Sequence, residues 1–221
     1  MAATLTFLHT SPAHIATFDA LLADLAAGVP ARHIVDESLL REARAEGAIT
    51  PQLVRRVEAT IREAAMTGAA VILCTCSTLG GTAVSVETRD AIVLRVDRPM
   101  AEQAVATGER IIVAAALAST LGPTRALLDD VARQGGKPIR LIGALCAPAW
   151  VMFERGDHDV YLRAIAARLE QVAGEGDVIV LAQASMAGAT RFCPSLPVPV
   201  LSSPRLGLEA AVAAYRARTE A

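Results

Sequence analysis

The sequence is poor in aromatic residues and has no long apolar run. Of its 221 residues only 3% are Phe, Trp or Tyr, although 53% are hydrophobic. Ala, Val, Leu and Ile supply most of the remainder, a composition typical of parallel strands covered by Ala-rich helices. The longest apolar run, residues 111–118, is far shorter than the roughly 20 residues that span a bilayer. We therefore expect no membrane-spanning segment.

The sequence also lacks an excess of charge of one sign. Its 21 basic and 23 acidic side chains are dispersed along the chain and give a formal net charge of -2. This pattern excludes a basic footprint for nucleic acid and favours a small-molecule partner. A basic leading segment is absent, and four cysteines at irregular spacing do not indicate a secreted disulfide scaffold. The expected location is the cytoplasm.

Short β-branched runs alternate with longer helical patterns throughout the chain. This alternation predicts parallel, right-handed βαβ units and an α/β fold. Strands are predicted at residues 4–8, 32–35, 69–73, 92–96, 110–116, 139–143, 177–181 and 198–201. Helices are predicted at residues 14–27, 51–66, 99–107, 124–134, 159–173 and 206–218, with a further helix after Thr78.

Two halves of the chain repeat one pattern of strand ends. The first half runs from a strand ending at His9-Thr10 to one ending at residues 74–78, and the second from Ser119-Thr120 to residues 182–185. We expect two pseudo-symmetric lobes, each with a parallel sheet flanked by helices: residues 1–97 with 203–221, and residues 98–202. Polar strand ends that meet across a cleft would form the ligand site.

The most distinctive segment is residues 71–81, an apolar strand that becomes polar just before a helix. A helix N-terminus lowers the pKa of a nearby thiol, so Cys76 could act as base or nucleophile. A buried structural cysteine is the alternative interpretation. Cys74 lies on the same strand face, deeper in the apolar run, and is predicted to belong to the core. The Cys-x-Cys pair has no second ligand cluster, so a zinc site is disfavoured.

Residues 76–78, Cys-Ser-Thr, resemble the Cys-Asn/Ser-Thr motif of the aspartate/glutamate/hydantoin racemase superfamily. Other segments fit the same family in order and spacing, and together they extend over nearly the whole chain. These segments are His9-Thr10 and residues 99–102, 108–110, 119–124 and 156–159.

The resemblance implies a two-lobed fold in which one cysteine from each lobe faces a small carboxylate substrate. One thiol removes the α-proton and the other returns a proton to the opposite face. The resemblance implies no pyridoxal phosphate and no metal, so hydroxyls and helix N-termini must stabilise the enediolate. It also implies a homo-oligomer. In this sequence the matching catalytic residue is Cys76, and the predicted substrate-binding residues are His9, Thr10, Ser77, Thr78, Ser119, Thr120, Gln183 and Ser185.

The second half departs from the family pattern. Gln183 stands where the second cysteine would align, and an amide is neither an acid nor a base near neutral pH. Cys193 lies too far along the chain to replace that thiol, which leaves Cys146 or His9 as an alternative proton carrier. His14 and His33 form no recognisable constellation in the sequence.

The leading hypothesis is therefore α-proton chemistry of the racemase or isomerase type, with Cys76 as base or proton donor. Because one cysteine replaces the usual pair, a one-base reaction is the alternative, such as decarboxylation followed by protonation, as in the related arylmalonate decarboxylases. Maleate isomerases of the same superfamily resemble the two-cysteine design. A binding protein that retained the carboxylate site without catalysis is a third possibility, and the identity of the substrate is left open.

Overall fold

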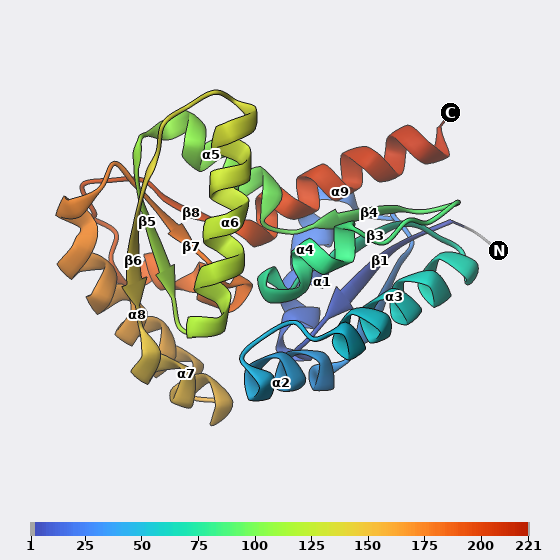
Figure 1. Cartoon of the computed structure of the whole chain (residues 1–221), viewed down its shortest axis with the longest axis horizontal. Coiled ribbons are helices and arrows are strands. Elements are labelled where there is room, and N and C mark those ends of the chain that lie inside the picture. Colours follow the sequence, from blue (N-terminus) through green and yellow to red (C-terminus); the bar gives the residue numbers. More distant parts are fainter. Residues whose placement is uncertain (1–2, 221) are drawn as a thin grey trace. The chain divides into compact units, whose positions relative to one another are not determined.

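The computed structural model describes residues 3–220, which form two compact units (Figure 1). Unit 1 comprises the described residues up to Asp97 together with those from Pro204 on, and unit 2 is Arg98–Ser203. The chain thus leaves unit 1 once and returns to it once. Each unit is an α/β structure with its own parallel sheet.

Unit 1 is built on a four-stranded parallel sheet in the order β2-β1-β3-β4. Its strands are β1 (Thr4–His9), β2 (Ala31–Val35), β3 (Ala69–Cys74) and β4 (Ile92–Arg95). Its helices are α1 (Ala13–Ala26), α2 (Glu37–Glu46), α3 (Pro51–Met66), α4 (Ser77–Val84) and α9 (Ser203–Thr219). Every residue of β3 is buried, as expected of a central strand covered on both faces.

Two apolar clusters lie on opposite faces of this sheet, because successive strand side chains alternate between faces. On one face, α1 and α9 pack on residues that include Phe7 and Leu73. On the other, α2, α3 and α4 pack on residues that include Leu8, Cys74 and Cys76. Within residues 3–220 no helix is both long and apolar enough to cross a membrane.

Unit 2 repeats the topology of unit 1, with its four parallel strands in the order β6-β5-β7-β8. Its strands are β5 (Arg110–Ala115), β6 (Arg140–Leu145), β7 (Val178–Leu181) and β8 (Val200–Ser202). Its helices are α5 (Arg98–Thr107), α6 (Ala118–Gln134), α7 (Ala147–Glu154), α8 (His158–Val172), and the 3-10 segments η1 (Ala173–Glu175) and η2 (Ala184–Phe192). Strands β5 and β7 of unit 2 therefore correspond to β1 and β3 of unit 1.

The α/β class with parallel sheets flanked by helices is confirmed, and each predicted strand lies where a strand is found. Three helices differ from the prediction. Helices α2 and α7 were not predicted, because α2 is charged and buries only Leu39 and Ala43, and α7 is short. Helix α6 begins at Ala118 and contains Pro123. Proline at the sixth position of α6 removes one backbone hydrogen bond, and the helix continues past it.

Candidate functional site

Cys76 lies two residues beyond β3 and is the N-cap residue of α4, with an extended backbone (φ -106°, ψ 111°). Its side chain is 7% exposed and belongs to the apolar cluster that also contains Cys74. The predicted shared face of the two cysteines is therefore observed. Burial raises the pKa of Cys74 to about 12, as expected for a core thiol.

The environment of the Cys76 sulfur combines burial with three hydrogen-bond donors. Burial has the largest effect and raises the pKa of the thiol. Hydrogen bonds from the Thr10 side chain and from the backbone of Leu79 and Thr78 oppose this increase, and the charge of Asp97 adds to it. The sequence-based expectation of a lowered pKa is wrong for this structure, because desolvation outweighs the helix N-terminus. Cys76 is therefore a protonated thiol near neutral pH.

Other predicted residues surround this thiol at the same end of the sheet. Thr10 follows β1, and Ser77 and Thr78 form the first turn of α4, whose N-terminus carries partial positive charge. All three side chains are buried. Among the described residues the buried Oγ of Ser77 has no hydrogen-bond partner. Unit 1 thus brings Cys76, Thr10, Ser77 and Thr78 together.

His9 is placed differently from this group. Its ring is fully buried and stacks on Phe7, on the sheet face that carries α1 and α9. Burial is the main cause that lowers its pKa to about 3, so the ring is neutral. Its Nδ1 lies 2.7 Å from Thr75 Oγ1 and its Nε2 lies 2.8 Å from His33 Nδ1. The interpretation that His33 forms no constellation is therefore wrong.

In unit 2, Gln183 occupies the position that Cys76 occupies in unit 1. It lies two residues beyond β7 and is the extended N-cap residue of η2. Its side-chain Oε1 accepts hydrogen bonds from the backbone N–H groups of Ala116 (2.7 Å) and Leu117 (3.0 Å). The amide oxygen thus connects the end of β7 to the chain that leaves β5.

The remaining predicted residues of unit 2 lie near the same strand ends. Ser119 and Thr120 are in the first turn of α6, and the buried Oγ of Ser119 has no partner among the described residues. Ser185 Oγ lies 2.8 Å from the hydroxyl of Tyr161, a side chain that is 1% exposed. Tyr161 was missed because, in the first turn of α8, it resembles any core aromatic in the sequence. Cys146 is the buried N-cap residue of α7, and burial raises its pKa to about 11.

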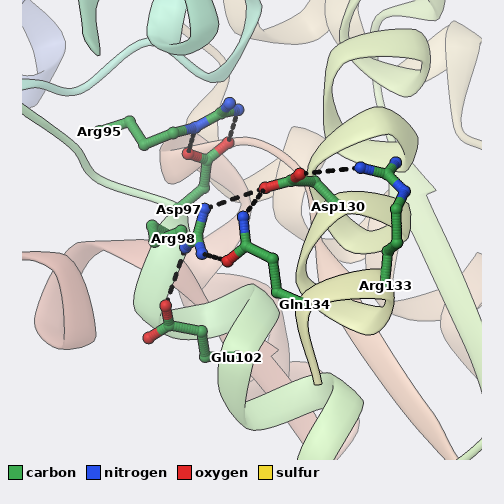
Figure 2. Close-up of polar contacts among 7 residues, drawn as sticks. All are labelled: Arg95, Asp97, Arg98, Glu102, Asp130, Arg133 and Gln134. Atoms are coloured by element: carbon green, nitrogen blue, oxygen red, sulfur yellow. Dashed lines mark hydrogen bonds and ion pairs between the residues drawn. The ribbon is translucent and has the colours of Figure 1, made fainter. Parts of the chain in front are cut away.

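Charged residues flank the point where the chain passes from unit 1 to unit 2 (Figure 2). In unit 1, Arg95 makes a two-point ion pair with Asp97, with distances of 2.6 and 3.0 Å. The Asp97 side chain is only 1% exposed and the Arg95 side chain 10%. In unit 2, Arg98 contacts residues of α5 and α6, namely Glu102, Asp130 and Gln134. Within residues 3–220 no cluster of His, Cys, Asp and Glu suited to a metal ion is found.

No family model and no curated protein sequence matches the chain. Solved structures do match it. Aspartate racemase from Picrophilus torridus has a TM-score of 0.72 at 12% identity, covering 98% of this chain and 94% of that one. Allantoin racemase from Klebsiella pneumoniae has a TM-score of 0.67 at 15% identity, covering 97% and 88%. Unliganded arylmalonate decarboxylase has a TM-score of 0.55 at 18% identity, covering 96% and 92%.

The chain has the same fold as these aspartate and allantoin racemases. The resemblance stated from the sequence is confirmed at the level of the fold, over nearly the whole chain. Because racemases and a decarboxylase share this racemase fold, the fold alone does not select one reaction. The choice between them depends on the side chains at the strand ends.

Proposed function

We propose that the protein is a cofactor-independent enzyme of the racemase and isomerase type that moves a proton at the α-carbon of a small carboxylate, with Cys76 as the proton carrier. The surroundings of the Cys76 sulfur carry this proposal, because the Thr10 side chain and two backbone N–H groups of α4 are hydrogen-bonded to it. Such donors stabilise the thiolate, so Cys76 can take the α-proton in that form and then return a proton from the thiol to the carbanion that results.

The N-terminus of α4 supports a role in holding the substrate carboxylate. Its backbone N–H groups and positive end favour an anion. The Ser77 hydroxyl is buried and has no partner among residues 3–220, so it is available to donate to a carboxylate oxygen. For unit 2 we propose that Ser119, Thr120 and Ser185 contribute further hydroxyl contacts to the substrate.

Two observations favour a one-base reaction as the second candidate. Gln183, which corresponds in position to Cys76, has no ionisable group, and two backbone N–H groups hold its oxygen. The raised pKa of Cys76 keeps its proton in place, which is the state that a proton donor requires. Decarboxylation of a malonate breaks a C–C bond, releases CO₂ and leaves the electron pair as an enediolate. The Cys76 thiol would protonate that carbon and recover its proton from water, so no second acid or base is needed.

The test is an isotope-exchange assay in D₂O with small amino acids, hydantoins and disubstituted malonates as probes, which follows α-deuteration and CO₂ release. We expect turnover by the wild type and a loss of about 100-fold or more in Cys76→Ala, since a positioned acid or base contributes about that much. Cys74→Ala is the matched control, because it removes a core thiol from the same strand and is expected to keep activity.

Each outcome separates one hypothesis from another. Deuteration without CO₂ release supports the racemase or isomerase type, whereas CO₂ release supports the decarboxylase. Loss of activity in Cys146→Ala as well as in Cys76→Ala would indicate a second thiol and contradict the one-base reaction. No turnover of any probe, with carboxylates still raising the melting temperature, would contradict an enzyme and favour a binding protein.

A further inference from the structure

A chain of hydrogen bonds crosses unit 1 on the α1 side of the sheet. It begins at Asp19 on α1, whose Oδ1 lies 3.0 Å from His33 Nε2. It continues from His33 Nδ1 to His9 Nε2 (2.8 Å) and from His9 Nδ1 to Thr75 Oγ1 (2.7 Å). Thr75 Oγ1 in turn lies 3.1 Å from the carbonyl oxygen of Leu8. Four side chains thus connect helix α1 to the ends of β1 and β3.

The two ends of this chain lie in different surroundings. The Asp19 side chain is 58% exposed and that of His33 17%, so this end exchanges protons with solvent. His9 is fully buried and Thr75 nearly so. The rings of His9 and His33 are nearly parallel, with an interplanar angle of 14° and centroids 5.1 Å apart, as expected of two rings joined edge to edge by a hydrogen bond.

The charged groups around the chain are few. On α1, Asp19 faces His33, and the His14 ring lies with its centroid 5.9 Å from that of His9. Helix α9 contributes mainly apolar residues to the cluster on this face, together with Tyr215, whose hydroxyl donates to the carbonyl of Ala3. The proton count of the chain is therefore set by His33 and Asp19, because burial keeps the His9 ring neutral.

Counting donors and acceptors gives one arrangement when His33 carries two protons. The imidazolium donates from Nε2 to Asp19 and from Nδ1 to His9 Nε2. Neutral His9 then carries its proton on Nδ1 and donates to Thr75 Oγ1. The Thr75 hydroxyl is left to donate to the Leu8 carbonyl, which already accepts the Thr75 backbone N–H at 3.0 Å. Every donor in the chain has an acceptor.

Removal of one proton from His33 reverses the rest of the chain. Asp19 accepts only, so the remaining proton of neutral His33 stays on Nε2 and its Nδ1 becomes an acceptor. His9 must then carry its proton on Nε2, and its Nδ1 accepts from the Thr75 hydroxyl. That hydroxyl turns away from Leu8. A single proton at the solvent-facing end thus decides which way the Thr75 hydroxyl points.

We propose that Asp19, His33, His9 and Thr75 form a proton-controlled relay that positions the strand ends carrying Thr10 and Cys76. Thr10 directly follows His9, and Cys76 directly follows Thr75. With His33 protonated, two bonds from Thr75 to the Leu8 carbonyl tie β3 to β1; with His33 neutral, one remains. The four members are positioning residues, because they lie on the opposite face of the sheet from the thiol. The existence of the relay does not depend on the proposed function. Its effect on catalysis rests on that function.

The direct test is ¹⁵N NMR of the histidine rings as a function of pH, using the full chain. We expect His9 to change from the Nδ1–H to the Nε2–H tautomer at the same midpoint at which His33 loses a proton. His158→Gln removes an exposed histidine that is not part of the hydrogen-bonded chain, and it is expected to leave the behaviour of His9 and His33 unchanged. A His9 tautomer that stays constant while His33 titrates would overturn the relay.

A second measurement tests the connection to the site. The alkylation rate of Cys76 in the wild type is expected to show an inflection at the His33 midpoint. In Thr75→Val, which keeps the shape and removes the hydroxyl, this inflection is lost while the His33 titration remains. Persistence of the inflection in a folded Thr75→Val variant would contradict positioning through Thr75. Neither readout requires turnover, so failure of the proposed function and failure of the relay are distinguishable.

Discussion

The two units place different chemistry at the same position of the same fold. In unit 1 the residue two positions beyond the third strand is Cys76, whose sulfur is hydrogen-bonded to the Thr10 side chain. In unit 2 it is Gln183, whose side-chain oxygen accepts hydrogen bonds from the backbone N–H groups of Ala116 and Leu117. The strand register aligns Thr10 with Ala116. The backbone geometry is thus retained, whereas only unit 1 has an ionisable side chain at this position.

The two units also differ at the residues directly before these positions. By register, His9 and Thr75 of unit 1 correspond to Ala115 and Ala182 of unit 2. Unit 1 therefore buries a polar chain where unit 2 buries methyl groups. A buried polar group requires a partner, and in unit 1 each of these side chains finds one in its neighbour.

The largest expected effect is a loss of stability at low pH that originates in unit 1. Burial lowers the pKa of His9 from 6.5 to about 3 and that of His14 to about 4. Below pH 6.5 the unfolded chain therefore binds protons that the folded chain does not. The stabilisation is complete above about pH 6.5 and is lost as the pH falls, by up to about 1.4 kcal/mol per pH unit for each histidine.

Urea unfolding between pH 7 and 4 measures this dependence. In His9→Gln the slope of unfolding free energy against pH should decrease by the contribution of one buried histidine. His158→Gln, which removes an exposed histidine, is the comparison variant. An equal slope in the wild type and in His9→Gln would show that His9 is not held neutral by the fold.

Removal of the buried ion pair of unit 1 should have the next largest effect. Asp97→Asn leaves the Arg95 guanidinium without its countercharge and is expected to cost about 3–5 kcal/mol of unfolding free energy. Asp24→Asn is the control, because its ion pair with Arg205 is exposed and a much smaller change is expected. Equal shifts of the denaturant midpoint in both variants would show that the burial of Asp97 has no energetic weight.

Gln183→Ala should destabilise unit 2 by about 1–3 kcal/mol, since two backbone N–H groups lose their acceptor. Gln183→Glu keeps an oxygen at this position and should retain most of the stability. The measurement is the urea midpoint of each variant. If alanine and glutamate variants are equally unstable, the bonds to Ala116 and Leu117 are not the reason for the amide.

The fold and the strand-end residues could be predicted from the sequence, but their partners could not. Continuous apolar runs such as residues 71–73 and 178–181 identify buried strands by themselves, and polar residues directly after them mark the site edge. By contrast, His33 and Asp19 reach His9 only through the pairing of β1 with β2 and the packing of α1. The raised pKa of Cys76 depends on burial, which motif matching does not report.

The smallest expected effect concerns Tyr161, whose hydroxyl the sequence pattern did not connect to Ser185. Tyr161→Phe removes one buried hydrogen bond and should cost about 1 kcal/mol. A double-mutant cycle with Ser185→Ala isolates the pair, and the two substitutions together should cost less than the sum of each alone. Additive changes would indicate that the two hydroxyls do not interact.

We propose that Cys76 takes part in the reaction as a protonated thiol supported by Thr10. The direct measurement is the titration of the Cys76 ¹³Cβ resonance in cysteine-labelled protein, assigned with Cys76→Ser. We expect a midpoint above the ordinary value of 9.0, because burial outweighs the hydrogen bonds. In Thr10→Val, which removes the donor, we expect a further increase. A midpoint below 9.0, or one that Thr10→Val leaves in place, would contradict the claim.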